Sequence, residues 1–116
     1  MRIGSIEISV AHPPLVIAEL SGNHNQSLER ALELVEAAAA SGVRAIKLQT
    51  YTADTITLDS DNPGFVISDE SSPWSGRNLY QLYKDAHTPW EWHKPIIDRV
   101  LELGMLWFSS PFDETA

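Results

Sequence analysis

The chain has 116 residues, which is enough for one domain with a hydrophobic core. Its 16 acidic residues against 8 basic ones give a formal net charge of −8, which argues against nucleic acid as the main partner, because phosphate binding needs clustered lysine and arginine. The lack of cysteine excludes disulfides and cysteine-ligated metals. With no visible signal peptide and no run near the ~20 apolar residues of a membrane span, we expect a soluble cytoplasmic protein.

The N-terminal part favours two short β segments. Ile6, Ile8 and Val10 alternate with polar residues, which predicts a half-buried strand or a hairpin. The apolar run Leu15–Leu20 follows and is interrupted only by Glu19. A run of this kind predicts a strand that is buried on both faces of a sheet.

Residues 27–42 predict an α-helix, and a strand follows it. Six apolar residues fall on one helical face: Leu28, Ala31, Leu32, Val35, Ala38 and Ala39. Ser27 can cap the start of this helix, and Gly42 can close its end. Arg44–Thr50 then predicts a second buried strand, so this part of the chain forms a βαβ unit with a right-handed connection.

The remaining chain repeats this alternation after a long interruption. Tyr51–Ser75 shows little periodicity, and a loop of this length is uncommon unless it is functional. Arg77–Ala86 predicts a short helix, and Thr88 predicts the N-cap of another, in which Pro95 should cost a hydrogen bond or produce a bend. Met105–Ser110 predicts a third strand. Because helices connect these strands, the sequence predicts an α/β fold with a parallel sheet.

Charged side chains near the ends of the predicted strands are candidates for an active site, since α/β folds build sites at that edge. Glu19 and Lys47 lie on neighbouring strands, where a buried charge is costly unless it is paired. The two could form a structural ion pair, or Lys47 could bind the carboxylate or phosphate of a substrate. Gln49 shares one side of its strand with Lys47, which favours a lined cavity.

Two further segments add candidate residues. Asn23 and His24 follow the first buried strand, where they could hold hydroxyls or carboxylates, although asparagine there is equally typical of a turn. Ser110 ends the third strand, where hydroxyls and backbone amides suit a phosphate, and where ordinary loop chemistry is the alternative. The four histidines have no metal-ligand spacing, and no P-loop, dinucleotide or zinc-helix motif is present.

Several strings of this sequence resemble the sialic acid synthase family. IAELSGNHNQSLERA, AIKLQTY and FSSPFD are similar to the family's IAEIGxNHxG, VKxQT and Ser/Thr-Pro-Phe segments. The strings KLQTYTADTITLD, NLYQLYKDA and TPWEWH are most similar to the pseudaminic acid synthase branch of that family. The resemblance extends from about residue 15 to the end of the chain.

This resemblance implies a (β/α)8 TIM-barrel enzyme that condenses phosphoenolpyruvate with an amino sugar and releases phosphate. It implies a divalent metal (Mn, Mg or Co) and a homodimer in the full-length protein. It also implies that Glu19 and Lys47 are catalytic, with Lys47 binding the carboxylate of phosphoenolpyruvate. The substrate-binding positions that it implies are Asn23, His24, Gln49 and Ser110.

A TIM barrel needs about 250 residues. We therefore expect residues 1–116 to be the N-terminal part of such a barrel, about three βα units preceded by a short β-hairpin. The remaining strands, the metal-binding histidines and a C-terminal antifreeze-like domain would lie outside this chain, which would be inactive on its own. The alternatives are an N-acetylneuraminate (sialic acid) synthase and, in another class, a non-catalytic anion-binding α/β module.

Overall fold

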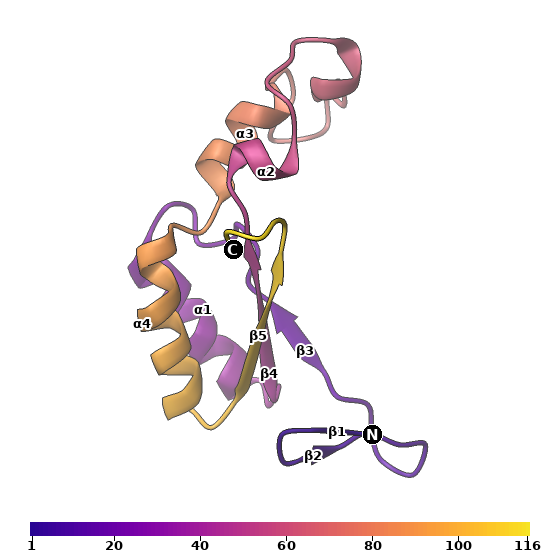
Figure 1. Ribbon diagram of the computed structural model, residues 1–116, viewed down its shortest axis with the longest axis vertical. Coiled ribbons are helices and arrows are strands. Elements are labelled where there is room, and N and C mark those ends of the chain that lie inside the picture. Colours follow the sequence, from indigo (N-terminus) through magenta and orange to yellow (C-terminus); the bar gives the residue numbers. More distant parts are fainter.

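A three-stranded parallel sheet is the centre of the computed structural model, which describes residues 1–116 (Figure 1). The sheet consists of β3 (Ile17–Glu19), β4 (Ala45–Thr50) and β5 (Leu106–Pro111), with β4 in the middle. α1 (Leu28–Ala40) connects β3 to β4, and α4 (Trp90–Glu102) leads into β5. The predicted parallel α/β arrangement is therefore confirmed.

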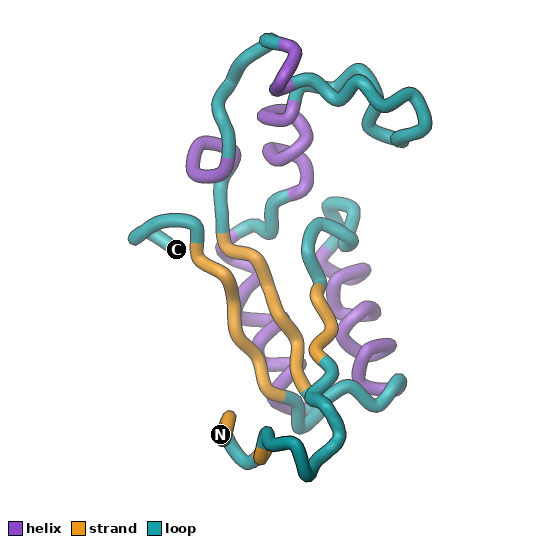
Figure 2. The backbone as a smooth tube through the Cα atoms, turned by 90° about the vertical axis from the view of Figure 1, so that its right-hand side faces the viewer, coloured by secondary structure: helices purple, strands orange, loops and turns teal.

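Both long helices cover the same face of this sheet, and no helix covers the other face (Figures 1 and 2). Eight buried residues between the helices and the sheet form the core: Leu20, Ala31, Val35, Ile46, Leu48, Ile96, Val100 and Met105. Ile46 and Leu48 of β4 point into this core. Because side chains alternate along a strand, Lys47 between them, and every second residue from it, points to the other side of the sheet. We call that second side, which carries Ile17, Lys47 and Phe108, the open face.

The prediction that Leu15–Leu20 is a strand buried on both faces is wrong. Only Ile17–Glu19 is extended in the sheet, and the side chains of Val16 and Ile17 are 59% and 41% exposed. The strand lies at the edge of the sheet, and its outward-pointing residues meet no second layer. A continuous apolar run predicts a strand that can be buried on both faces of a sheet. It does not show that residues of this chain cover both of those faces.

The helix ends follow the sequence signals closely. Ser27 Oγ accepts a hydrogen bond from the backbone N–H of Arg30 at 3.1 Å, and Gly42 follows the helix with φ of +87°, so both predicted ends of α1 are confirmed. α4 begins one residue later than predicted, with Pro89 rather than Thr88 at the N-cap position. The helix continues through Pro95, which has no N–H to donate.

A small antiparallel hairpin, β1 (Arg2–Ile3) with β2 (Ile6–Glu7), precedes the sheet. The predicted alternation holds at Ile6, which is buried, and fails at Val10, which is fully exposed. A Cβ at Gly4 would lie 3.1 Å from the side chain of Leu106, so the hairpin lies against the start of β5. It therefore sits by the amino ends of the strands, away from the edge where active sites form (Figure 1).

Residues 52–86 form an arm above the carboxyl ends of the strands (Figure 1). The arm contains α2 (Ala53–Ile56), a 3₁₀ turn at Pro63–Phe65 and α3 (Leu79–Ala86), which confirms the predicted short helix. The radius of gyration of the Cα atoms is 16.4 Å, whereas a compact domain of this length has about 13 Å. None of the helices is long and apolar enough to cross a membrane.

Candidate active site

The two predicted charges form an ion pair on the open face. Glu19 on β3 is the register partner of Lys47 on β4, and their Oε2 and Nζ atoms are 2.8 Å apart. The side chains remain 36% and 28% exposed. Of the two readings left open by the sequence, the structure shows the pairing, and the remaining exposure leaves both groups within reach of a ligand.

Two polar residues extend this pair toward the carboxyl edge of the sheet. Gln49 follows Lys47 by two residues and therefore shares its side of β4. Its register partner on β5 is Ser110, which points to the same face. Glu19, Lys47, Gln49 and Ser110 thus form one polar row across three strands, which we call the polar row. An ammonium, an amide and a hydroxyl together suit a ligand that carries a carboxylate or a phosphate.

His24 lies elsewhere and is completely buried. Its Nδ1 accepts a hydrogen bond from the backbone N–H of Gln26 at 3.2 Å, so the proton of the neutral ring is on Nε2, which donates to Thr88 Oγ1 at 3.3 Å. The ring also meets Trp92 edge-on, with 5.2 Å between centroids. Burial, and secondarily repulsion from His87, lowers the pKa of His24 below its ordinary value of 6.5.

These contacts leave His24 no ring nitrogen for a ligand, so the geometry favours a structural role over the expected substrate contact. The bond from His24 joins the β3–α1 loop to Thr88, the residue before the N-cap of α4, across 64 residues of sequence. Asn23 is exposed, and its amide donates to the carbonyl oxygen of Leu20 at 3.1 Å, which is the turn role that the sequence also allowed.

The loop between β3 and α1 is held in a strained conformation. Ser21, Asn25 and Gln26 have φ of 47°, 49° and 60°, a region that residues other than glycine rarely occupy. A Cβ at Gly22 would lie 2.9 Å from the backbone oxygen of Ala86, so the loop touches the end of α3. The loop that follows Glu19 is therefore fixed between α4 and the arm.

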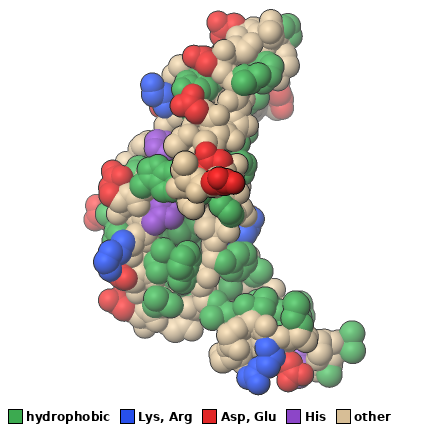
Figure 3. Space-filling model, in the orientation of Figure 1, with side chains coloured by type: hydrophobic (Ala, Val, Ile, Leu, Met, Phe, Trp, Pro, Cys, Tyr) green, Lys and Arg blue, Asp and Glu red, His purple; other side chains and the backbone are tan.

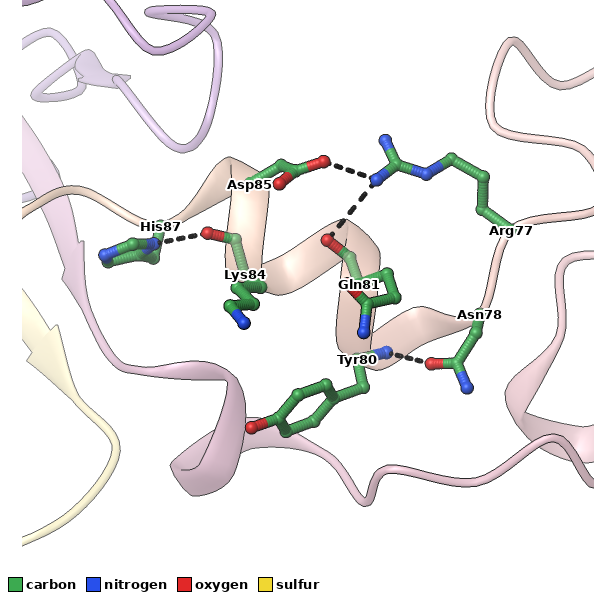
Figure 4. Close-up of polar contacts among 7 residues, drawn as sticks. All are labelled: Arg77, Asn78, Tyr80, Gln81, Lys84, Asp85 and His87. Carbon is green, nitrogen blue, oxygen red and sulfur yellow. Dashed lines mark hydrogen bonds and ion pairs between the residues drawn. The ribbon is translucent and has the colours of Figure 1, made fainter.

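Polar contacts order the arm itself (Figure 4). Arg77 pairs with Asp85 across the start and end of α3, and Asn78 caps the helix by accepting from the N–H of Tyr80 at 2.7 Å. The hydroxyl of Tyr80 donates to Asp54 of α2 at 2.9 Å, and this bond raises the pKa of Tyr80. α2 and α3 are therefore joined into one unit above the site.

A half-buried polar contact that the sequence did not predict lies on the opposite face of the same strand ends. Thr50 Oγ1 lies 2.9 Å from His93 Nε2 and 2.6 Å from Ser109 Oγ. The alternation of β4 and β5 was the available signal, because it puts Thr50 and Ser109 on the face opposite to Gln49 and Ser110, where polar residues are unusual. Nothing in the sequence indicated that His93 would meet them.

The residues of this chain do not form a metal centre. No group of three or more His, Cys, Asp or Glu side chains lies close enough to hold an ion. The carboxylate of Glu19 faces a lysine. A divalent metal therefore does not fit the residues of this chain alone.

Comparison with known proteins gives consistent matches. A family model described as the NeuB family matches residues 34–116. The chain is 50% identical over 97 residues to the pseudaminic acid synthase of Campylobacter jejuni serotype O:2, a match that covers 84% of this chain and 28% of that protein. It is 46% identical over 106 residues to the pseudaminic acid synthase of Helicobacter pylori, covering 90% and 30% of the two chains.

Among solved structures, the chain is similar to N-acetylneuraminic acid (sialic acid) synthetase from Leptospira borgpetersenii, in complex with citrate. The TM-score is 0.75 at 25% identity, over 99% of this chain and 35% of that one. The chain thus spans 28% to 30% of the length of these two curated relatives.

Proposed function

Because this chain belongs to the NeuB family, we propose that the protein is a phosphoenolpyruvate-dependent nonulosonic acid synthase. Membership of that family confirms the resemblance to the sialic acid synthases that the sequence strings indicated. The observation that carries the proposal is the polar row, which lies on one accessible face at the carboxyl edge of a parallel sheet. That edge is where α/β enzymes bind substrates.

The sugar proposed is 2,4-diacetamido-2,4,6-trideoxy-altrose, which would make the product pseudaminic acid. Identities of 50% and 46% to two pseudaminic acid synthases support this choice. The second candidate is N-acetylneuraminate synthesis, which the structural similarity to a sialic acid synthetase supports. The arm is where the two specificities could differ, because it stands above the strand ends that carry the polar row (Figure 1).

We also propose that β3, β4 and β5 are the first three strands of a (β/α)8 barrel, with the open face on its inside. Helices on one face only, and polar residues on the other, agree with this arrangement. Residues 1–116 would then be the N-terminal portion of the barrel domain. The other strands and a C-terminal antifreeze-like domain would belong to the rest of the protein.

The proposed reaction forms a bond between C3 of phosphoenolpyruvate and the aldehyde carbon of the open-chain sugar, whose oxygen takes up a proton. Water adds at C2 and loses a proton. The tetrahedral intermediate then breaks its C2–O bond to phosphate, which leaves a 2-keto acid and inorganic phosphate. The atoms of phosphoenolpyruvate, sugar and one water balance those of the two products.

The residues of the polar row suit separate parts of this reaction. Lys47 would bind the carboxylate of phosphoenolpyruvate and position its nucleophilic carbon. Ser110 would donate to a phosphate oxygen, and Gln49 would bind the sugar. Glu19 Oε2 lies 2.8 Å from the ammonium of Lys47 in this structure, so it would lie close enough to a ligand of Lys47 to orient it or to exchange a proton with it.

The family resemblance also supports a divalent ion, Mn, Mg or Co, and a homodimer for the complete protein. Its ligands would be residues outside these 116. Treatment with EDTA should then abolish turnover, and Mn²⁺ should restore it. Full activity after chelation, checked by metal analysis of the sample, would contradict the metal proposal.

The test of the proposed function is turnover by the complete protein. Phosphate release is measured with phosphoenolpyruvate and each of the two candidate sugars, and the products are identified by mass spectrometry. We expect the pseudaminic acid product, and the sialic acid product would favour the second candidate. Binding of phosphoenolpyruvate without phosphate release from any sugar would instead support a non-catalytic anion-binding module.

A further inference from the structure

A hydrogen-bonded chain of three side chains lies directly behind the polar row. Thr50 ends β4, Ser109 lies on β5, and His93 is the fourth residue of α4. Thr50 Oγ1 is 2.9 Å from His93 Nε2 and 2.6 Å from Ser109 Oγ. The contacts join residues 43 and 59 positions apart, so they tie both strands to the helix at the edge that carries the candidate site.

The chemistry of the partners determines the direction of these bonds. His93 Nδ1 lies 3.3 Å from the carbonyl oxygen of Pro89, which can only accept, so the proton of the neutral ring is on Nδ1. Nε2 must then accept from the Thr50 hydroxyl. Since the one hydrogen of Thr50 is used in this way, Ser109 donates to Thr50.

The ring of His93 is also held in place by its surroundings. Trp90 stacks on it, with 5.9 Å between centroids and 24° between planes. Thr50 is only 5% exposed, so its hydroxyl depends on protein partners for its hydrogen bonds. His93 and Ser109 are half-buried and line one cavity together with Thr50, so these hydrogen bonds lie in the wall of that cavity.

The polar row depends on the same two strand ends. Gln49 immediately precedes Thr50, and Ser110 immediately follows Ser109. The β4–β5 ladder ends with the pair Thr50 and Pro111, so the side-chain bonds reinforce the sheet where its backbone bonds end. A shift of either strand end would move Gln49 or Ser110 relative to Lys47.

We propose that His93 is a positioning residue of the candidate site, which acts through Thr50 and Ser109 to hold Gln49 and Ser110 in place for phosphoenolpyruvate. This inference rests on the proposed function, because it assigns the polar row to that substrate. His93 itself does not touch the substrate, since it lies on the opposite face of the sheet.

The test uses three substitutions of His93 in the complete protein. His93→Gln puts an amide oxygen near the place of Nε2 and can still accept from Thr50. His93→Phe keeps the ring without the bond, and His93→Asn reaches only the place of Nδ1. Lys94→Gln is the matched control, because Lys94 is the next residue of the same helix and its side chain is 82% exposed.

Steady-state kinetics are measured with phosphoenolpyruvate varied at saturating sugar. We expect His93→Phe and His93→Asn to raise the KM for phosphoenolpyruvate about tenfold with kcat within about twofold, His93→Gln to stay within about twofold of the unmodified protein, and Lys94→Gln to change nothing. An unchanged KM in His93→Phe, or equal effects of Phe and Gln, would overturn the proposal. If His93→Phe does not fold, Thr50→Val against Thr50→Ser provides the same comparison.

A second readout does not depend on turnover. The ¹⁵N chemical shifts of the His93 ring report which nitrogen carries the proton, and we expect Nδ1. A proton on Nε2 of the neutral ring would overturn the hydrogen-bonded chain even in an active enzyme. Absence of turnover by the unmodified protein with either sugar would overturn the proposed function instead, while the ring shifts still decide whether the chain of bonds exists.

Discussion

At the scale of single residues, the Glu19–Lys47 ion pair can act in two ways: it can stabilise the fold, or it can contribute to substrate binding. The two effects differ in size. A pair with about a third of each side chain exposed contributes only about 0–1 kcal/mol to stability, since water screens the attraction. Removal of a lysine that binds a substrate carboxylate lowers kcat/KM by a much larger factor. Measurements of stability and of activity on the same variant therefore distinguish the two roles.

We expect Lys47→Met to lower kcat/KM at least about 100-fold while the thermal midpoint changes little, because the bond to the substrate is lost and the structural contribution is small. Turnover by phosphate release and thermal unfolding by circular dichroism measure the two effects. The control is the double variant Glu19→Gln with Lys47→Met, which removes both charges. Recovery of turnover in that variant would mean that Lys47 only neutralises Glu19.

His24 leads to a prediction about pH. Its folded-state pKa lies below 6.5, so between that pKa and 6.5 the unfolded chain binds more protons than the folded one. The stabilisation from His24 is thus complete above pH 6.5 and is lost as the pH falls toward the folded-state pKa. We expect the urea midpoint to decrease over this range.

In a His24→Leu variant the urea midpoint should be lower at neutral pH and should depend less on pH below 6.5. His87 lies near enough to add to the effect, so His87→Gln is measured beside it. The exposed residue His12 provides the control, and His12→Gln should leave the slope unchanged. The same steep slope in the His24→Leu variant would contradict the assignment.

At the scale of the elements, the important contact is the one between the β3–α1 loop and the arm. The two segments are separated by about sixty residues of sequence, yet the loop approaches the end of α3 so closely that only glycine fits at position 22. This contact joins the segment that follows Glu19 to the segment that stands above the site. It is therefore a place where a small change should affect both.

Gly22→Ala is expected to destabilise the protein by about 1–3 kcal/mol, because the added Cβ would lie 2.9 Å from a backbone oxygen that cannot simply rotate away. Urea unfolding measures the loss, and limited proteolysis reports whether residues 52–86 become easier to cleave. Gly64→Ala in the arm is the matched control, since nothing lies within 4 Å of its Cβ position. Equal stability of both variants would show that the contact is not tight.

At the scale of the whole molecule, the sheet has one covered face and one uncovered face. Only 15 of the 116 residues are buried, and large apolar side chains, among them Val16, Trp107 and Phe112, remain exposed. Apolar side chains gather visibly over α4 and the adjoining strand (Figure 3). Exposed apolar surface of this kind and unpaired strand edges favour association.

We therefore expect residues 1–116, produced as a separate polypeptide, to self-associate and to release no phosphate from phosphoenolpyruvate with sugar and Mn²⁺. Analytical ultracentrifugation and the phosphate assay test the two parts, with the complete protein as the positive control. A stable monomer would contradict the first part, and phosphate release above background would contradict the second.

The sequence by itself determined the order and type of the main elements, the parallel sheet and the polar row. These depend on local signals, such as the Ser27 cap, the Gly42 stop and the alternation that puts Lys47 and Gln49 on one side of a strand. The sequence also indicated the family, through strings of residues that each lie within a single segment. The short helix α2 was missed because its signal, Thr52 with Thr55, spans a single turn.

Only the tertiary structure decided that both helices share one face, that β3 is an exposed edge, and that His24 is buried against Thr88 rather than open to a ligand. The hydrogen bonds of Thr50 with His93 and Ser109 were likewise decided only by the tertiary structure. The physical reason is sequence distance: these contacts join residues 43 to 64 positions apart, and no local pattern of polar and apolar residues encodes which distant side chain completes a hydrogen bond.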